Sequence, residues 1–327
     1  MSELRPPQAT QTLERFQHPD WTAGGEPRAS VPLTRLETLW INTGSLCNIT
    51  CERCYVESSP RNDRLAYITR EDVRALYDEI AAGGLDTREI GFTGGEPFLN
   101  PEMLGLMEDA LARGFQVLVL TNAMQPMQRP VIEAGLIELH RRYGSRLTVR
   151  VSLDHYGQAL HESERGQGGW DKTLAGLDWL ARHGFKVAIA ARTCWGEPES
   201  DMRAGFARLF AGHGWPIDPA DPSQLVLLPE MDGRRNVPEI TARCWDILHK
   251  RPEEMMCATS RMVVKRKGWD RVSVVPCTLL PYEPQFDMGA TLAQSRAADG
   301  GMFAAGAVKL CHPHCSTFCA LGGGSCS

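Results

Sequence analysis

Apolar and polar positions alternate along the middle of the chain in a way that predicts strands followed by helices. A short apolar run, Leu39–Ile41, predicts the first strand. The apolar residues Val73, Leu76, Tyr77 and Ile80 then recur at the spacing of one helix face. Five more strands are predicted at Glu89–Phe92, Val117–Leu120, Leu147–Leu153, Val187–Ala191 and Leu225–Leu228. Six strand-then-helix units are typical of an α/β fold with parallel strands.

Capping residues bound the helices between these strands. Thr69, with Asp72 three residues later, predicts the start of the first helix, and the pair Gly83–Gly84 predicts its end. Asn100 followed by a proline opens the next helix, which Gly114 ends. Further helices are predicted near residues 129–142, around Leu174–Leu180 and near 199–211.

The pattern divides the chain into three parts. Residues 1–33 are rich in Pro, Gly, Gln and Thr and lack periodicity, which indicates an N-terminal arm that is at most partly ordered. Residues 34–235 hold the strand–helix units. After residue 235 the alternation stops, and Met262–Lys265 with Val272–Val275 predicts a hairpin. We therefore expect a smaller, cysteine-rich domain at 236–327.

Composition narrows the classes of protein. The chain has 327 residues, is 43% hydrophobic and carries a net charge of -5. It therefore lacks the excess of basic residues that is typical of a nucleic-acid-binding protein. It has no apolar run long enough for a membrane span and no apolar signal segment at its N-terminus, so we expect a cytoplasmic protein. Eleven cysteines in that compartment indicate metal or redox chemistry rather than disulfides.

Three of these cysteines, Cys47, Cys51 and Cys54, form a C-x3-C-x2-C triplet directly after the first strand. Three thiolates on one loop can bind three corners of a [4Fe–4S] cluster and leave the fourth iron open. An open iron can chelate the amino and carboxylate groups of S-adenosylmethionine (SAM). A zinc knuckle or a redox cysteine set is the alternative, but a structural zinc site needs four ligands, and no fourth Cys or His lies near this loop.

The triplet resembles the signature of the radical SAM superfamily, and the resemblance extends over about residues 36–235. It implies a partial (β/α)6 TIM-like barrel in which Cys47, Cys51 and Cys54 hold the catalytic cluster. It also implies reductive cleavage of SAM to a 5′-deoxyadenosyl radical, with an electron donor such as a flavodoxin or ferredoxin. Family members often have an aromatic residue before the third cysteine. Here Arg53 takes that place, and Tyr55 follows the cysteine as the candidate for contact with the cofactor.

The segment Thr93-Gly94-Gly95-Glu96-Pro97 follows the second strand. Two glycines allow the backbone to approach a ligand closely, and the Glu96 carboxylate can accept a hydrogen bond from an ammonium group. The segment is similar to the one that contacts the methionine amino group of SAM in the family. Taken alone, it could also be a tight turn between strand and helix.

Other polar residues also follow predicted strands. Thr121 and Asn122 resemble the family's TNG segment, and Ser152 with Asp154 resembles its SLDG segment near the SAM ribose. Arg192 ends the fifth strand and could bind the SAM carboxylate or cap a surface loop. In parallel barrels the carboxyl ends of the strands carry the chemistry, so these residues are expected on one face.

Two further polar segments fall on the same face. His161 and Arg165-Gly166 come after the fourth strand at family-like spacing, or form a plain polar loop. Glu230 and Asp232 follow the sixth strand and are candidates for substrate contact or a solvated turn.

The hairpin between Cys257 and Cys277 resembles the start of the SPASM or twitch extension of radical SAM enzymes. That resemblance implies one auxiliary [4Fe–4S] cluster, for which the expected ligands are Cys257, Cys277, Cys315, Cys319 and Cys326. Cys311 is a weaker candidate, and a second cluster is possible if the substrate or Cys244 completes its ligands. A zinc site that uses His312 and His314 is the alternative. Cys194 and Cys244 are otherwise expected to be buried small apolar residues.

These features favour a SAM-cleaving enzyme that abstracts hydrogen from a peptide or a small molecule. An iron–sulfur electron carrier or a regulatory metal-binding protein would use the cysteines without SAM, but it would not need the Gly94-Gly95-Glu96 segment. A zinc-stabilised binding module is a third possibility. The sequence does not name the substrate.

Overall fold

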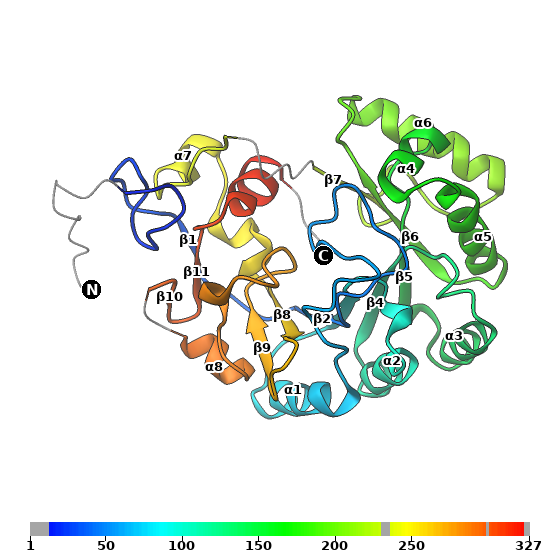
Figure 1. Ribbon diagram of the computed structural model, residues 1–327, viewed down its shortest axis with the longest axis horizontal. Helices are drawn as coiled ribbons and strands as arrows, with labels where there is room; N and C mark the ends of the chain where they lie inside the picture. Colours follow the sequence, from blue (N-terminus) through cyan, green and yellow to red (C-terminus); the bar gives the residue numbers. More distant parts are fainter. Residues whose placement is uncertain (1–12, 230–235, 299–300, 324–327) are drawn as a thin grey trace.

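The computed structural model describes residues 13–229, 236–298 and 301–323. Its main feature is a curved eight-stranded sheet in the order β7-β6-β5-β4-β3-β2-β8-β9 (Figure 1). The six strands expected in the core are confirmed and pair in parallel with their neighbours. They are β2 (Thr38–Asn42), β3 (Glu89–Thr93), β4 (Gln116–Thr121), β5 (Leu147–Ser152), β6 (Lys186–Arg192) and β7 (Leu225–Leu228).

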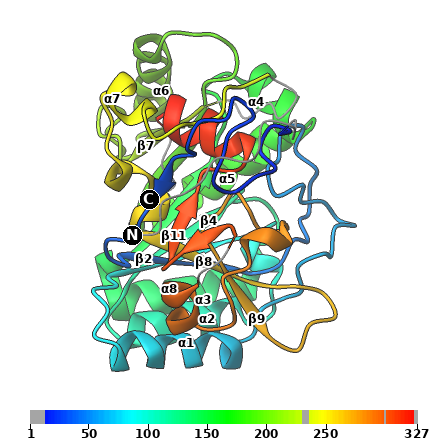
Figure 2. The ribbon, with the colours of Figure 1, turned by 90° about the vertical axis from the view of Figure 1, so that its left-hand side faces the viewer.

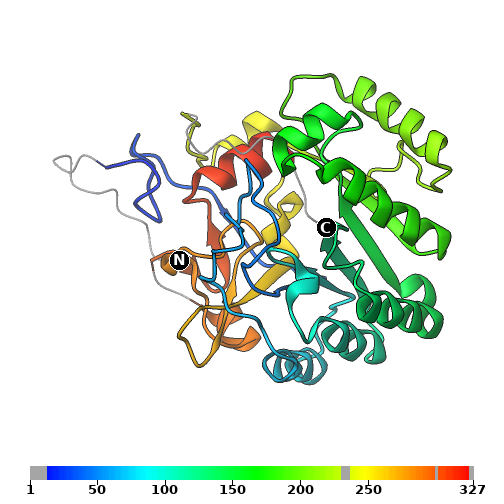
Figure 3. The same cartoon turned by 45° about the vertical axis from the view of Figure 1, so that its right-hand side comes forward.

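Helices cover the outer side of this sheet and follow one another around it (Figure 3). They are α1 (Arg70–Ala82), α2 (Met103–Ala112), α3 (Pro130–Tyr143), α5 (Gly169–Arg182) and α6 (Glu199–His213), as expected from the sequence. Thr69 and Asp72 form the reciprocal hydrogen bonds of a capping box at the start of α1. One helix was not expected: α4 (Gln158–Arg165) forms where a family-like segment or a polar loop was predicted.

The hairpin predicted after residue 235 is present as β8 (Ser260–Lys265) and β9 (Val272–Val275). β8 lies parallel to β2, with Thr38 opposite Ser260, so the hairpin extends the main sheet. The expected boundary at residue 235 therefore does not separate two sheets.

The N-terminal segment is built into the C-terminal part of the chain, which the expected arm at 1–33 did not anticipate. β1 (Ser30–Val31) pairs antiparallel with β11 (Ala307–Lys309), which also pairs with β10 (Phe303–Ala304) (Figure 2). The buried Arg28 forms an ion pair with Glu239. Its guanidinium also donates to the carbonyl oxygens of Trp21, at 2.9 Å, and Leu310, at 3.1 Å.

The remaining elements are short. They are α7 (Cys244–Leu248), α8 (Leu292–Ala297), the 3-10 helices η1 (Pro97–Leu99), η2 (Gly144–Arg146), η3 (Pro252–Glu254), η4 (Met256–Ala258) and η5 (Pro284–Phe286), and the π-helical segment η6 (Cys315–Leu321). None of the helices within the described ranges is long and apolar enough to cross a membrane.

Candidate active site and auxiliary cysteine site

Cys47, Cys51 and Cys54 lie on the loop after β2 and line one cavity at the carboxyl ends of the barrel strands. The cavity encloses about 650 Å³, including the space at its open mouth. The predicted SAM-site residues Tyr55, Gly94, Gly95, Thr121, Asn122, Ser152 and Arg192 line it as well, together with Ser58 and Arg165. The parallel register thus gathers loops that are far apart in sequence. Glu96, Pro97 and Asp154 are buried next to these residues rather than lining the cavity.

Glu96 faces the loop after β4. Its carboxylate accepts hydrogen bonds from the Thr121 hydroxyl, at 2.8 Å, the Asn122 amide, at 2.9 Å, and the Phe98 amide, at 3.2 Å. Burial raises the pKa of this carboxyl to about 7, against the opposing effect of these donors. In this arrangement Glu96 braces two strand-end loops, a role that the expected ammonium contact did not include.

The two glycines before Glu96 serve a close approach between loops. The amide of Gly95 donates to the carbonyl of Gly44 at 2.8 Å, and a Cβ atom at Gly95 would lie 2.0 Å from the carbonyl oxygen of Leu46. Gly94 has a φ of +149°, and a Cβ there would lie 2.6 Å from the Gly44 carbonyl oxygen. The glycines therefore let the β3 loop pack on the chain segment that leads into Cys47.

Asp154 lies at the centre of a buried charge cluster. Arg165 donates to both of its carboxylate oxygens, through Nε and through Nη2, the latter at 3.1 Å. Arg192 Nε lies 3.3 Å from the same carboxylate, and His161 Nδ1 lies 3.9 Å away. Although burial alone would raise it, the two arginines hold the pKa of Asp154 below its usual value. The carboxylate expected near the SAM ribose is thus occupied by two arginines.

The three sulfur atoms have hydrogen-bond donors close by. Asn122 Nδ2 lies 3.9 Å from Cys47 Sγ, Arg165 Nη1 lies 3.8 Å from Cys51 Sγ, and the Ser58 amide donates to Cys54 Sγ at 3.3 Å. Burial raises the pKa of Cys47 to about 12 and also raises that of Cys51. Such thiols lose their protons when iron binds, and the nearby donors then stabilise the thiolates, so this donor set fits an iron–sulfur cluster.

A second cavity adjoins the first. It is lined mainly by apolar side chains, has a volume of about 410 Å³ including its open side, and shares Tyr55, Val56, Thr93 and Leu120 with the cysteine-lined cavity. The Arg192 guanidinium lies over the Tyr55 ring, 5.2 Å from its centroid. Arg150 from β5 and Thr278, next to Cys277, complete the wall. Neither residue could be assigned to the site from the sequence, because only the curvature of the sheet brings β5 close to the segment after β9.

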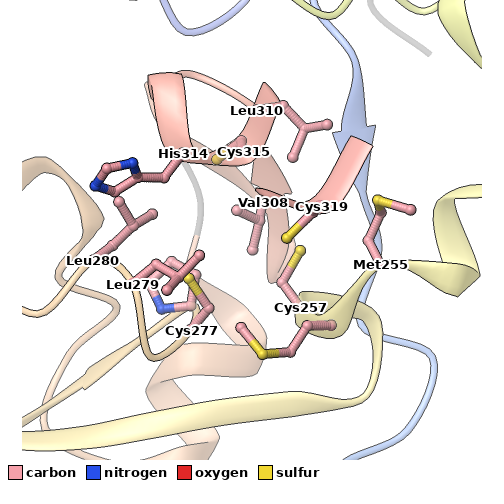
Figure 4. A pocket seen from close by; sticks show the side chains of 12 residues that line it. Met255, Cys257, Cys277, Leu279, Leu280, Val308, Leu310, His314, Cys315 and Cys319 are labelled. Atoms are coloured by element: carbon pink, nitrogen blue, oxygen red, sulfur yellow. The ribbon is translucent and has the colours of Figure 1, made fainter. Parts of the chain in front are cut away.

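Four of the expected auxiliary ligands, Cys257, Cys277, Cys315 and Cys319, line a single apolar cavity of about 370 Å³, including the space at its opening. Figure 4 shows the sulfur atoms of Cys257 and Cys319 facing one another, with Cys277 approaching from another side. Cys257 belongs to η4 and Cys277 follows β9, whereas η6 carries Cys315 and Cys319. Burial raises the pKa of Cys257 to about 11 and raises that of Cys315 as well.

A buried arginine lies behind this cavity. Arg261 is fully buried and donates to the backbone carbonyl oxygens of Cys257, at 2.6 Å, Ser260, at 2.8 Å, and Gly306, at 2.7 Å. A cation in such surroundings favours a negatively charged group nearby, as a thiolate-bound cluster would be. The four-cysteine cavity therefore also fits an iron–sulfur cluster.

The other cysteines and histidines have separate places. Cys311 Sγ donates to the carbonyl oxygen of His18 at 3.4 Å and does not line the four-cysteine cavity. Cys326 lies outside the described residues, as do Glu230 and Asp232. Cys194 and Cys244, expected to be buried, are both partly exposed. His314 lines the rim of the cavity, whereas His312 does not.

No three His, Cys, Asp or Glu side chains in the described part of the chain converge closely enough to bind one metal ion.

Comparisons with known proteins agree with this geometry. The profile described as "Radical SAM superfamily" matches residues 41–204, which is half of the chain. The chain belongs to the radical SAM superfamily. Members of this superfamily bind a [4Fe–4S] cluster and SAM, which confirms the family and the cofactors expected from the cysteine triplet.

Several relatives of this radical SAM protein are known. The antilisterial bacteriocin subtilosin biosynthesis protein AlbA of Bacillus subtilis is 31% identical over 145 residues, 44% of this chain and 30% of AlbA. GTP 3′,8-cyclase 1 of Pseudomonas aeruginosa is 29% identical over 156 residues, 46% of this chain and 44% of the cyclase. The chain thus aligns with less than half the length of these curated relatives.

Among solved structures, Streptococcus suis SuiB bound to S-adenosylmethionine has a TM-score of 0.57 at 13% identity, over 82% of this chain and 67% of SuiB. SuiB has also been solved bound to its precursor peptide SuiA, with a TM-score of 0.50 to this chain, over 77% of this chain and 61% of SuiB. AlbA and SuiB are radical SAM enzymes of the SPASM type, in line with the resemblance of the C-terminal extension. The barrel fold expected for the core is confirmed by this similarity.

Proposed function

We propose that the Cys47, Cys51 and Cys54 thiolates hold the [4Fe–4S] cluster and that the chain uses it to cleave SAM reductively. The observation that carries the proposal is that these cysteines and seven of the predicted SAM-site residues line one cavity at the carboxyl ends of the barrel strands. Among the described residues that line it, there is no fourth thiol, imidazole or carboxylate. The residues present would therefore leave one iron open for SAM.

When bound together, the cluster and SAM supply a 5′-deoxyadenosyl radical that abstracts hydrogen from an unactivated C–H bond. The chain's own part is to hold, orient and shield. Thr121, Asn122 and Ser152 present hydroxyl and amide groups to the cavity, and Arg192 presents a cation that suits the SAM carboxylate. The Tyr55 ring offers an aromatic face.

The reacting group of the substrate would enter the adjoining cavity between Tyr55 and Thr278. That cavity is narrow and largely apolar, so it suits an amino-acid side chain or a metabolite of similar size. AlbA acts in bacteriocin biosynthesis, and SuiB has been solved with a precursor peptide. The name of GTP 3′,8-cyclase, in contrast, indicates a nucleotide. We therefore propose a peptide or small-molecule substrate, with electrons supplied by a flavodoxin or ferredoxin in the cytoplasm.

The auxiliary cluster would be held by Cys257, Cys277, Cys315 and Cys319, because these four thiols share one cavity. Cys326 stays a candidate from the sequence. A cluster at this place could accept an electron from a substrate radical or anchor the substrate, since Thr278 connects the wall of the adjoining cavity to Cys277.

Anaerobic reconstitution with iron and sulfide, followed by dithionite and SAM, tests the proposal. The wild-type chain should form 5′-deoxyadenosine, and Cys47→Ala, Cys51→Ala and Cys54→Ala should each abolish it while auxiliary iron remains. Cys244→Ser is the matched control, since Cys244 lines neither cysteine cavity. A fully loaded wild-type protein that forms no 5′-deoxyadenosine would instead favour an iron–sulfur electron carrier.

The substrate class is tested separately with deuterated candidates. Transfer of deuterium into 5′-deoxyadenosine identifies a substrate and the carbon that is attacked. Short peptides with one deuterated residue type and small metabolites of the same size form the two arms of this experiment.

A further inference from the structure

Arg165 has a position that neither the cluster ligands nor the SAM-binding loops explain. It is the last residue of α4, and its side chain reaches back under the cysteine loop, with only 11% of its surface exposed. Its Nε and Nη2 atoms donate to the two oxygens of the Asp154 carboxylate, a bidentate pair. One N–H group, on Nη1, remains directed at the sulfur of Cys51, 3.8 Å away.

Within the Asp154 cluster the positive and negative charges do not cancel. Two arginines, Arg165 and Arg192, share the single Asp154 carboxylate. His161 is the other titratable group of this cluster, and burial lowers its pKa to about 4, so it is neutral near pH 7. The Arg165 guanidinium therefore places positive charge beside Cys51, in surroundings that water screens poorly. The buried Glu96 carboxyl also acts on Arg165 and offsets part of this charge.

We propose that Arg165 sets the reduction potential of the cluster on Cys47, Cys51 and Cys54, through its hydrogen bond to the Cys51 sulfur, and that Asp154 holds it in place. One-electron reduction by the external donor adds negative charge to the cluster and its thiolates. Hydrogen bonds to the ligand sulfurs and nearby positive charge stabilise that reduced form and raise the potential. Arg165 is a positioning residue in this account, and the inference rests on the proposed function only for the placement of the cluster.

Arg192 provides the matched comparison. It carries the same charge, contacts the same carboxylate and lines the same cavity, but it contacts Asp154 and the Tyr55 ring, whereas Arg165 also donates to a cysteine sulfur. Removal of either arginine removes one unit of charge from the cluster region. Only removal of Arg165 also removes the N–H donor to Cys51.

The experiment is a redox titration of the reconstituted full-length chain, followed by electron paramagnetic resonance without SAM. The signal that changes when SAM is added afterwards marks the SAM-site cluster, and the auxiliary signal is the internal reference. Arg165→Gln should shift the midpoint potential of the SAM-site cluster to more negative values. At a fixed donor potential its reduced-to-oxidised ratio should fall by about tenfold, the effect of one charge-assisted hydrogen bond. Arg165→Lys and Arg192→Gln should each shift the potential less.

Three results overturn the inference. The first is an Arg165→Gln protein that binds its full iron and has the same midpoint potential as the wild type. If Arg165→Gln does not take up iron, the same result in iron-loaded Arg165→Lys counts instead. Another is an Arg192→Gln shift as large as that of Arg165→Gln. The third is weaker SAM binding at an unchanged potential, which would make Arg165 a SAM ligand. A shifted potential in a protein whose wild type forms no 5′-deoxyadenosine would support the inference and reject the proposed function.

Discussion

Thr121 donates a hydrogen bond of 2.8 Å from its hydroxyl to the carboxylate of Glu96, and both residues are buried. The bond joins the loop that ends β3 to the loop that ends β4. Because each loop also lines the cavity of Cys47, Cys51 and Cys54, the hydrogen bond holds two walls of that cavity at a set distance.

The Glu96 carboxyl should make stability depend on pH. Its pKa is raised in the folded chain from 4.5 to about 7, so its protonated form favours folding. This contribution is fully present below about pH 4.5 and is lost as the pH rises through 7, with a total of about 3 kcal/mol. Glu96→Gln should remove this dependence of the free energy of unfolding on pH, which urea unfolding at several pH values measures.

The difference between wild type and Glu96→Gln is the quantity to compare, because other groups titrate nearby. Burial lowers the pKa of His161, His312 and His314 to about 4, and their contribution to stability is lost on acidification, which is the opposite sign. The same slope in both proteins between pH 4.5 and 7 would contradict the assignment to Glu96.

A methyl group at Gly95 should displace the cysteine loop. Its Cβ would lie 2.0 Å from the Leu46 carbonyl oxygen, so the segment that leads into Cys47 would have to move. We expect Gly95→Ala to lose most of the SAM-site iron, measured by iron analysis after reconstitution. Gly212→Ala is the control, because that helical position has open space around it and should gain about 0.5–1 kcal/mol of stability. Equal iron content in both variants would count against the packing argument.

Iron content should separate the C-terminal cysteines. Two cubane clusters hold about eight irons. Cys257→Ala and Cys319→Ala should lower this towards four, because both sulfurs point into the same cavity. Cys311→Ser should keep the full content, since the Cys311 sulfur lies beside the His18 carbonyl instead. If Cys311→Ser loses as much iron as Cys319→Ala, then Cys311 is also a ligand and the proposed set of four is wrong.

The N-terminal segment should contribute strongly to stability through Arg28. Arg28→Met leaves the Glu239 carboxylate, only 6% exposed, without its ion-pair partner, which should cost about 3–5 kcal/mol in urea unfolding. Arg35→Met is the surface counterpart: the Arg35–Glu37 pair is largely exposed, and its loss should cost at most about 1 kcal/mol. Similar losses in the two variants would mean that the buried pair has no special role.

The sequence predicted the barrel strands well because their signal is local. Short apolar runs such as Val117–Leu120 and Leu225–Leu228 lie between capping and turn residues, and burial in a parallel sheet needs only that pattern. The helix α4 was missed, because its sequence has few apolar residues and it buries polar ones, His161 and Glu164. Helical periodicity of apolar residues gives no signal for such a segment.

The site was predictable in its membership but less so in its contacts. The cysteine triplet and the loop residues could be assigned to one face, because the carboxyl ends of parallel strands meet there. The sequence does not predict the hydrogen-bond partners of the two buried carboxylates. Thr121 donates to Glu96 and Arg165 donates to Asp154, and these donors come from other segments that only tertiary packing brings close. The same holds for Arg28 and Glu239, which lie 211 positions apart.

The parallel pairing of β2 with β8 has a consequence for the order of synthesis. On the ribosome, β3 can join one side of β2 early, but the other side has no partner until Ser260–Lys265 has emerged. During that interval a strand of five buried residues presents open backbone groups to other chains. A nascent chain stalled before residue 260 should therefore recruit chaperones, and one released after β8 should not.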